Sequence, residues 1–300
     1  MQRVPKQECF KTKLILDMLL LFTFIAAIIS IYNKFAVVLS GLLLTWTCVA
    51  AHNFFHQKNN WRMYTFNLSF MNYREWRISH ALSHHLYPNT LIDIECMMAE
   101  PFLVWYPEEK GFKKYFSIVA SPFVYSGIYF SQLGLRFFTK NQDTPLWENF
   151  IPLTLPFMMF LATGANIFTV LSTWILIIIF SSFVFGIIGI NAAHHHPKIY
   201  HHGDKPRDDL DFGIFQLDAV MDRTDITGST FLVLTNFGDH GLHHLFPTID
   251  HAYLPHLYPV LEEVCKQFNV KLRFTTQWDL IKGQFRQLLK TLPNTKSPGM

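Results

Sequence analysis

Charged residues are scarce in this sequence. Only 16% of its 300 residues are Asp, Glu, Lys or Arg, whereas 50% are hydrophobic and 30 are Phe. A water-soluble fold of this size needs more charged side chains to cover its surface. The scarcity therefore argues against a soluble domain and favours a protein embedded in a membrane. The net charge of +3 is small, and we expect no nucleic-acid partner.

Cysteine is scarce as well, and its spacing argues against several kinds of small fold. The four cysteines, Cys9, Cys48, Cys96 and Cys265, lie far apart and form no Cys-x-x-Cys pair. This argues against a disulfide framework, a zinc ribbon and a redox dithiol, and we expect buried or inert thiols. The first apolar run also lacks a small-residue cleavage site, so we expect it to remain in the protein as an anchor.

Long apolar runs predict four membrane spans, at about residues 14–32, 35–55, 147–163 and 167–190. At about 1.5 Å per residue, helices of this kind can cross a hydrocarbon core of about 30 Å. Four cations precede the first run and one lies in the turn after it, which predicts a cytosolic N-terminus. An even number of spans then predicts a cytosolic C-terminus as well.

The third span is the one that the sequence leaves open. One candidate is residues 150–162, which would form a hairpin with the last run, and the other is residues 116–135. We favour 150–162, because Ser, Pro and Gln interrupt the apolar run at 116–135. We expect 116–135 to lie at the membrane interface. The polar segments 57–114 and 191–300 should be cytosolic. The predicted fold is a single all-α domain over 1–300, a polytopic membrane helical bundle with four transmembrane helices and a cytosolic His-rich cap.

The C-terminal region predicts one further helix. Apolar residues recur at helical spacing at Trp278, Ile281, Phe285, Leu288, Leu289 and Leu292, with Lys282, Arg286 and Lys290 along the flank. This pattern is typical of a basic amphipathic helix. Two placements remain open, one on the cytosolic leaflet of the membrane and one packed on the body of the cytosolic domain.

Histidine is the residue that clusters. Of the 15 histidines, most fall in four groups: His52-x-x-x-His56, His80-x-x-x-His84-His85, Asn191-Ala-Ala-His194-His195-His196, and His240-Gly-Leu-His243-His244. Read as helix, the last spacing of i, i+3 and i+4 sets three imidazoles on one face. If these groups are to meet, an even number of spans must separate them. Four spans satisfy this condition and put all four groups on the cytosolic side of the membrane, close enough to share a metal site.

The number of imidazoles predicts two metal ions. His52, His56, His80, His84, His85, His240, His243 and His244, with His194 or His195, are too many for one ion, since a zinc site takes four protein ligands or fewer. Imidazole suits Fe, Zn, Cu and Ni, so ligand type alone does not choose the metal. No Glu-x-x-His occurs within these groups, which disfavours the soluble di-iron carboxylate class.

The surroundings of the groups give further expectations. Carboxylates that could accept the distal N–H of a ligating ring stand beside the groups at Asp93, Glu95, Asp239 and Asp250. His196, His201 and His202 are expected to lie in a solvated loop. A metal transporter would need ionisable groups within its spans, and the two carboxylates in these spans, Asp17 and Glu148, lie near span ends.

The groups resemble the histidine boxes of the membrane fatty acid desaturase and hydroxylase superfamily. His240-Gly-Leu-His-His-Leu-Phe-Pro-Thr is similar to the third box of the front-end, cytochrome b5-linked desaturases, and residues 14–290 follow their order of spans and boxes. His80-Ala-Leu-Ser-His-His-Leu-Tyr-Pro-Asn-Thr, together with Phe237-Gly-Asp-His, resembles still more closely the insect cytochrome b5-related proteins. Asn191-Ala-Ala-His194 resembles the Asn and His that complete the metal shell of acyl-CoA desaturases.

The resemblance implies an endoplasmic-reticulum enzyme with two Fe ions that uses O2 and two electrons to dehydrogenate a fatty acyl chain. It also implies that Asn191 acts through a bound water. A hydroxylase of the same superfamily and an inactive relative that retains the metal site are the alternatives. The second box departs from the commoner pattern, since three residues rather than two separate His80 from His84; we expect His80 to approach the metal from a different angle.

The resemblance also implies an electron donor. A fused cytochrome b5 domain would contain His-Pro-Gly-Gly, which does not occur in this sequence. We therefore expect a separate cytochrome b5, with its reductase, to dock on the cytosolic face. Complementary positive charge for this docking could come from Lys58, Arg62, Arg74, Arg77, Lys198, Lys205 and Arg207.

Overall fold

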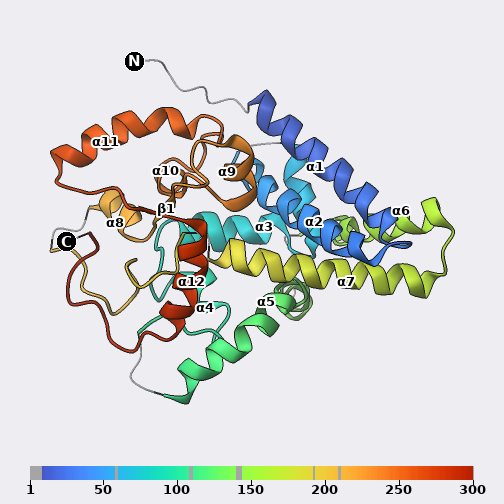
Figure 1. Cartoon of the computed structure of the whole chain (residues 1–300), viewed down its shortest axis with the longest axis horizontal. Coiled ribbons are helices and arrows are strands. Elements are labelled where there is room, and N and C mark those ends of the chain that lie inside the picture. Colours follow the sequence, from blue (N-terminus) through green and yellow to red (C-terminus); the bar gives the residue numbers. More distant parts are fainter. Residues whose placement is uncertain are drawn as a thin grey trace. The chain divides into compact units, whose positions relative to one another are not determined.

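The computed structural model divides the chain into two compact units. Unit 1 comprises Met1–Cys9, Arg77–Ser121 and Ile187–Met300, and unit 2 comprises Phe10–Trp76 and Pro122–Gly186. Residues 9–57, 60–107, 111–139, 144–191, 193–208 and 211–299 are described by the structure. Helices dominate both units (Figure 1), which confirms the predicted helical membrane-type fold in its general form.

Unit 2 is a helical bundle centred on α2. Its helices are α1 (Phe10–Ile29), α2 (Lys34–Phe55), η1 (Trp61–Ser69), α3 (Tyr73–Trp76), the part of α5 (Phe112–Thr139) from Pro122 onward, η3 (Leu146–Leu153), α6 (Thr154–Thr163) and α7 (Ile167–Phe185). Helix α2 packs against α1 and α7, and the three run side by side in Figure 1. The α2–α7 contact is close because Gly41 faces Phe180, where an added Cβ would lie 2.6 Å from the ring.

Local signals in the sequence place the ends of these helices. Asn33 caps α2 by accepting a hydrogen bond of 2.9 Å from the backbone N–H of Phe35, and Asn166 caps α7 in the same way through Phe168, at 2.8 Å. Side chains of Asn are favoured at this position because they satisfy N–H groups that have no partner within the helix. The short turns before α2 and α7 therefore follow directly from the sequence.

Three helices of the described residues are long and apolar enough to cross a membrane: Phe10–Ile29, Lys34–Phe55 and Ile167–Gly189. They correspond to the predicted spans at 14–32, 35–55 and 167–190. The segment predicted as the third span, 147–163, folds instead as two shorter helices, η3 of 8 residues and α6 of 10 residues. The count of four spans therefore stays a prediction.

Unit 1 is made of short helices joined by ordered loops. They are η2 (Arg77–His84), α4 (Ile94–Met97), the start of α5, the end of η4 (Gly186–Ile190), α8 (Phe212–Asp218), α9 (Thr230–Asn236), α10 (His240–Leu245), η5 (Leu254–Leu257), α11 (Tyr258–Gln267) and α12 (Gln277–Leu288). Two short strands, β1 (Asp222–Arg223) and β2 (Phe274–Thr275), pair in parallel. The strand pair fixes the segment just before α12 beside the segment that leads to α9.

The predicted C-terminal helix packs on the body of unit 1. Gly283 of α12 faces His196, whose ring would clash with any added Cβ, and Gln287 Nε2 donates to the Trp105 carbonyl at 2.7 Å. His196 and His201 are 3% and 0% exposed. The expectation of a solvated loop is wrong for these two histidines, because α12 covers His196, and His201 lies against the His195 ring. His202 is exposed as expected.

Candidate metal centre

The second histidine box comprises His80 and His84 of η2, which is a π-helix, and His85, which directly follows it. In an α-helix the fifth residue along lies about 140° around the axis from the first, so His85 would point away from His80. The π-turn closes this gap with a hydrogen bond of 2.9 Å from the backbone N–H of His85 to the His80 carbonyl. His80 and His85 thereby face each other, with their Nε2 atoms 3.1 Å apart. The extra residue in this box is absorbed by the wider helix.

The third box forms α10, and a tight turn before the helix sets its direction. Phe237 and Asp239 both adopt left-handed backbone angles, with φ of 52° and 49°. The Arg223 side chain donates to the Phe237 carbonyl, and the Asp222 carboxylate accepts the backbone N–H groups of His240, at 2.5 Å, and Gly241, at 3.1 Å. A carboxylate at this position stabilises the first turn of the helix. The turn therefore fixes the direction in which the box begins.

In the fourth group, the neighbouring residues His194 and His195 contact different partners. His194 donates its Nδ1–H to the Ala219 carbonyl at 2.9 Å and turns its Nε2 toward the other boxes. His195 instead stacks on Trp105, with ring centroids 3.8 Å apart, and its Nδ1 lies 3.2 Å from His201 Nε2. Of the two histidines between which the sequence did not decide, His194 is the one that joins the cluster. Asn191 is buried nearby, with its amide bonded to the Ile187 carbonyl.

Four buried histidines from three segments converge, and we call them the four-His group: His84, His194, His240 and His244. Each offers one ligand atom, and these atoms lie within 4.8 Å of one another. His194 Nε2 is 3.0 Å from His84 Nε2, 2.7 Å from His240 Nε2 and 3.0 Å from His244 Nε2. Two nitrogens bound at about 2.1 Å to one ion and at a right angle would be about 3.0 Å apart, so the spacing fits a shared metal ion.

The hydrogen bonds of the distal nitrogens strengthen this interpretation. His194 donates Nδ1–H to a carbonyl, and His244 donates Nδ1–H to Gln216 Oε1 at 2.8 Å. Burial lowers the pKa of both imidazoles well below the ordinary value, so both rings are neutral. Their Nε2 atoms therefore carry lone pairs, not protons, and these face each other at 3.0 Å. A cation between them removes the repulsion, and the neutral imidazole is the form that binds a metal.

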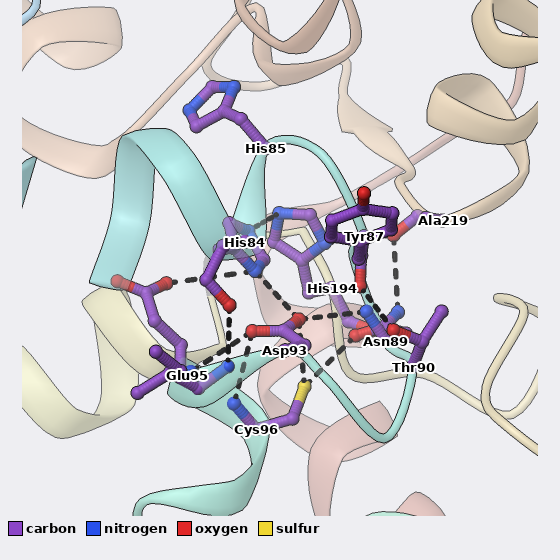
Figure 2. Close-up of polar contacts among 12 residues, drawn as sticks. His84, His85, Tyr87, Asn89, Thr90, Asp93, Glu95, Cys96, His194 and Ala219 are labelled. Carbon is purple, nitrogen blue, oxygen red and sulfur yellow. Dashed lines mark hydrogen bonds and ion pairs between the residues drawn. The ribbon is translucent and has the colours of Figure 1, made fainter. Parts of the chain in front are cut away.

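Two carboxylates, Asp93 and Glu95, lie beside His84 and favour its positively charged form. His84 Nδ1 lies 2.9 Å from Asp93 Oδ2, as Figure 2 shows. Burial would lower the pKa of His84, but the charges of Asp93 and Glu95 outweigh it and raise that pKa to about 9. Burial would likewise raise the pKa of Asp93, but His84 lowers it to about 2. The site thus holds an ionised carboxylate directly behind one candidate ligand.

A second set of three histidines, the three-His group, lies in the same unit: His80, His85 and His243. Their candidate ligand atoms are also within 4.8 Å of one another. His80 Nδ1 is 3.1 Å from both oxygens of Glu95, and the His243 ring stacks on His251 with centroids 4.8 Å apart. The remaining pair, His52 and His56, ends α2 in unit 2, where their Nε2 atoms are 3.0 Å apart.

Asn89 ties the second box to the fourth group. Its side-chain amide donates to the carbonyls of His194, at 3.1 Å, and Tyr200, at 2.9 Å, while its backbone N–H donates to the Asp93 carboxylate at 2.8 Å (Figure 2). Asp93 is therefore linked to the loop that holds His194 through Asn89, whose backbone it binds and whose side chain binds that loop. Because Asn89 is fully buried, these bonds have no competing water.

Some supporting residues follow from the sequence and others do not. Asp93 and Glu95 contact histidines of the second box, as expected of carboxylates beside the boxes. Asp239 instead accepts a hydrogen bond from Tyr258, and Asp250 accepts the backbone N–H of Cys9. Gln216 and Asn89 were missed, because an isolated amide in a polar stretch carries no sequence signal for the partner that it meets in the fold.

Comparisons with known proteins show which family the chain resembles. The fatty acid desaturase family model matches residues 30–276 of the chain. The cytochrome b5-related protein of Drosophila melanogaster is 46% identical over 276 residues, which cover 89% of this chain and 63% of that protein. Acyl-lipid (8-3)-desaturase B of Dictyostelium discoideum is 33% identical over 103 residues, which cover 31% of this chain and 21% of that protein.

The matches cover different shares of the relatives' lengths. The chain spans less than two thirds of the length of the curated relatives that it matches. No solved structure gives a significant match. The family match nevertheless covers most of the chain, including every histidine of the four groups, and confirms the resemblance drawn from the boxes. The chain therefore belongs to the fatty acid desaturase family.

Proposed function

We propose that the chain is a di-iron, O2-dependent fatty acyl desaturase that receives electrons from a separate cytochrome b5. The observation that carries this proposal is the pair of buried, neutral imidazoles, His194 and His244, whose unprotonated Nε2 atoms face each other at 3.0 Å. Folding brings these lone pairs together at a cost that a bound cation would offset. Family membership supports a lipid substrate and an oxidative reaction.

In this proposal the four-His group holds one iron ion and the three-His group holds the other, and His52 and His56 of α2 are the further expected ligands. Bound iron would supply the oxidising power to remove hydrogen from an unactivated alkyl chain with O2 and two electrons. Imidazoles bind a metal in their neutral form, so an all-imidazole set would leave the positive charge of the metal largely uncompensated and favour a strongly oxidising centre. Asn191 would act through a bound water.

The protein's own residues keep these ligands in a reactive state. Asp93 and the Ala219 carbonyl accept the distal N–H groups of His84 and His194, which fixes the tautomer that presents Nε2. Gln216 does the same for His244. All the members of the four-His group are at most 3% exposed, so bulk water is kept from the ligands and each ring is held without reorganisation.

The electron donor would dock on the cytosolic face of an endoplasmic-reticulum protein whose termini both lie in the cytosol. Lys198 and Lys205 support this, because both are exposed and follow His194 in the chain. They offer positive charge to an acidic partner. Three of the other expected contributors are engaged within the protein: Arg62 pairs with Asp17, Arg74 with Glu148 and Arg207 with Asp218. Lys58 lies outside the described residues.

The test is expression of the chain in desaturase-deficient yeast, with and without added cytochrome b5, followed by mass spectrometry of the lipids. A desaturase product has lost two hydrogens, whereas a hydroxylase product has gained one oxygen. The variant His84→Ala should abolish the product. The matched control His256→Ala, which removes an exposed histidine outside the groups, should leave it unchanged.

Three outcomes would count against the proposal. Products that gain oxygen would replace desaturation with hydroxylation. Two bound irons without any lipid change would indicate an inactive relative that retains the metal site. Equal amounts of product from wild type and from His84→Ala would show that the reaction does not use this metal centre.

A further inference from the structure

Unit 1 holds a cavity that the metal centre does not use. It lies between α8 and α11 and has a volume of about 390 Å³. The lining residues are Asp211, Gly213, Ile214, Leu217, Leu245, Phe246, Leu257, Val260, Leu261, Val264, Cys265, Phe268 and Val270. None of the histidines of the four-His or three-His groups is among them. Its size falls in the range of about 300–1,000 Å³ that is usual for ligand sites.

The wall of the cavity suits hydrocarbon better than water. A buried water needs two to four polar partners, and Asp211 is the one charged side chain in the lining. The outer edge is apolar as well: Val260 and Val264 on α11, and Phe268 directly after it, recur every four residues and are 46%, 42% and 65% exposed. A ligand with an alkyl chain would fill the interior and remove this edge from water.

The charge in the lining limits the chemistry of the ligand. Asp211 caps α8 by accepting the Ile214 backbone N–H at 3.0 Å, so its carboxylate is held at the cavity. An anionic headgroup placed beside it would be repelled. An alkyl chain whose polar end is uncharged meets no such penalty.

We propose that this cavity binds the hydrocarbon chain of an uncharged lipid, at a site apart from the metal centre. The two sites share their supporting helices. Leu217 of the cavity follows Gln216 in α8, and Leu245 follows His244 in α10, while Gln216 and His244 are bonded to each other on the metal side. A chain in the cavity therefore packs against the same two helices that hold one of the candidate ligands.

Photolabelling tests the site directly. The full chain in detergent micelles is irradiated with a long-chain alcohol that carries a diazirine in its alkyl chain, and labelled peptides are mapped by mass spectrometry. We expect labels on 212–218 and 258–268 that excess unlabelled alcohol displaces. Leu261→Trp, which fills the cavity, and Val264→Asp, which puts charge at its edge, should each reduce these labels by about tenfold. Labelling of the apolar helices of unit 2 serves as the internal control for delivery of the probe.

A matched variant and a matched probe sharpen the test. Leu292→Trp makes the same change at a residue of unit 1 that is 73% exposed and outside the cavity, and it should leave the labels unchanged. A fatty acid with the same diazirine should label about fivefold less than the alcohol because of Asp211, and Asp211→Asn, which can still cap α8, should remove the difference.

The proposal is overturned if 212–218 and 258–268 remain unlabelled, if excess alcohol does not displace the label, or if both cavity variants are labelled like wild type. Equal labelling by the acid and the alcohol would overturn the preference for an uncharged ligand. The His84→Ala chain should label like wild type, because the cavity contains no candidate metal ligand. The result therefore stands or fails independently of the desaturase proposal.

Discussion

The second and third histidine boxes reach similar arrangements through different helices. Helix η2 spaces its histidines as His-x-x-x-His-His and is a π-helix, whereas α10 spaces them as His-x-x-His-His and is an α-helix. The second box contributes one histidine to the four-His group and two to the three-His group, whereas the third box contributes two to the four-His group and one to the three-His group. Helix geometry adapts to the number of intervening residues. The positions of the imidazoles, not their spacing in sequence, define the site.

The largest effect should come from the histidine that meets both boxes. His194 Nε2 lies within 3.0 Å of rings from η2 and from α10, so His194→Ala removes the centre of the four-His group. We expect bound metal to fall from about two ions per chain to about one or fewer, measured by elemental analysis of purified protein. His195→Phe, which keeps the stack on Trp105, is the control and should retain its metal. Full metal content in His194→Ala would refute the grouping.

A smaller effect should follow at the second box from Asp93→Asn. The ionised carboxylate makes a charge-assisted bond to His84, and such outer partners typically contribute about 10–100-fold to metal affinity. We expect a loss near the upper end of this range, measured by competition with a chelator. If Asp93→Asn releases metal no faster than wild type, the carboxylate does not support the site.

At the third box the corresponding change is Gln216→Leu. Its amide oxygen makes a neutral hydrogen bond to His244, which is weaker than a charged one. We expect metal affinity to fall by about tenfold, less than for Asp93→Asn, in the same chelator assay. Gln267→Leu changes an exposed glutamine on α11 and is the matched control. A larger loss at Gln216 than at Asp93 would reverse the proposed difference between the boxes.

The smallest effect should come from two exposed lysines, Lys198 and Lys205, that follow His194 in the chain. Reversing the charge of two exposed residues, in the double variant Lys198→Glu and Lys205→Glu, should slow reduction by cytochrome b5 by roughly threefold to tenfold at low salt. The difference should shrink as salt screens the charges, while metal content is unchanged. Stopped-flow reduction at two ionic strengths measures this, with Lys266→Glu on α11 as the control. A loss that is independent of salt would argue against electrostatic docking.

Much of this arrangement follows from the sequence, and the reasons are physical. The helices α1, α2 and α7 are predictable because long apolar runs leave few alternatives, and α10 is predictable because its histidines repeat at helical spacing. The π-turn of η2 is not predictable, since an extra residue in the box could equally turn one imidazole away from the others. The different directions of His194 and His195 depend on Ala219 and Trp105. Contacts of that kind, between residues far apart in sequence, leave no local pattern.

The most direct test of the metal centre is the iron content of the full chain, purified after growth in iron-supplemented medium and measured together with its Mössbauer spectrum. Two histidine groups predict two irons per chain, in non-haem environments dominated by nitrogen ligands. One iron or none per correctly folded chain, after reconstitution with excess ferrous ion, would contradict the account.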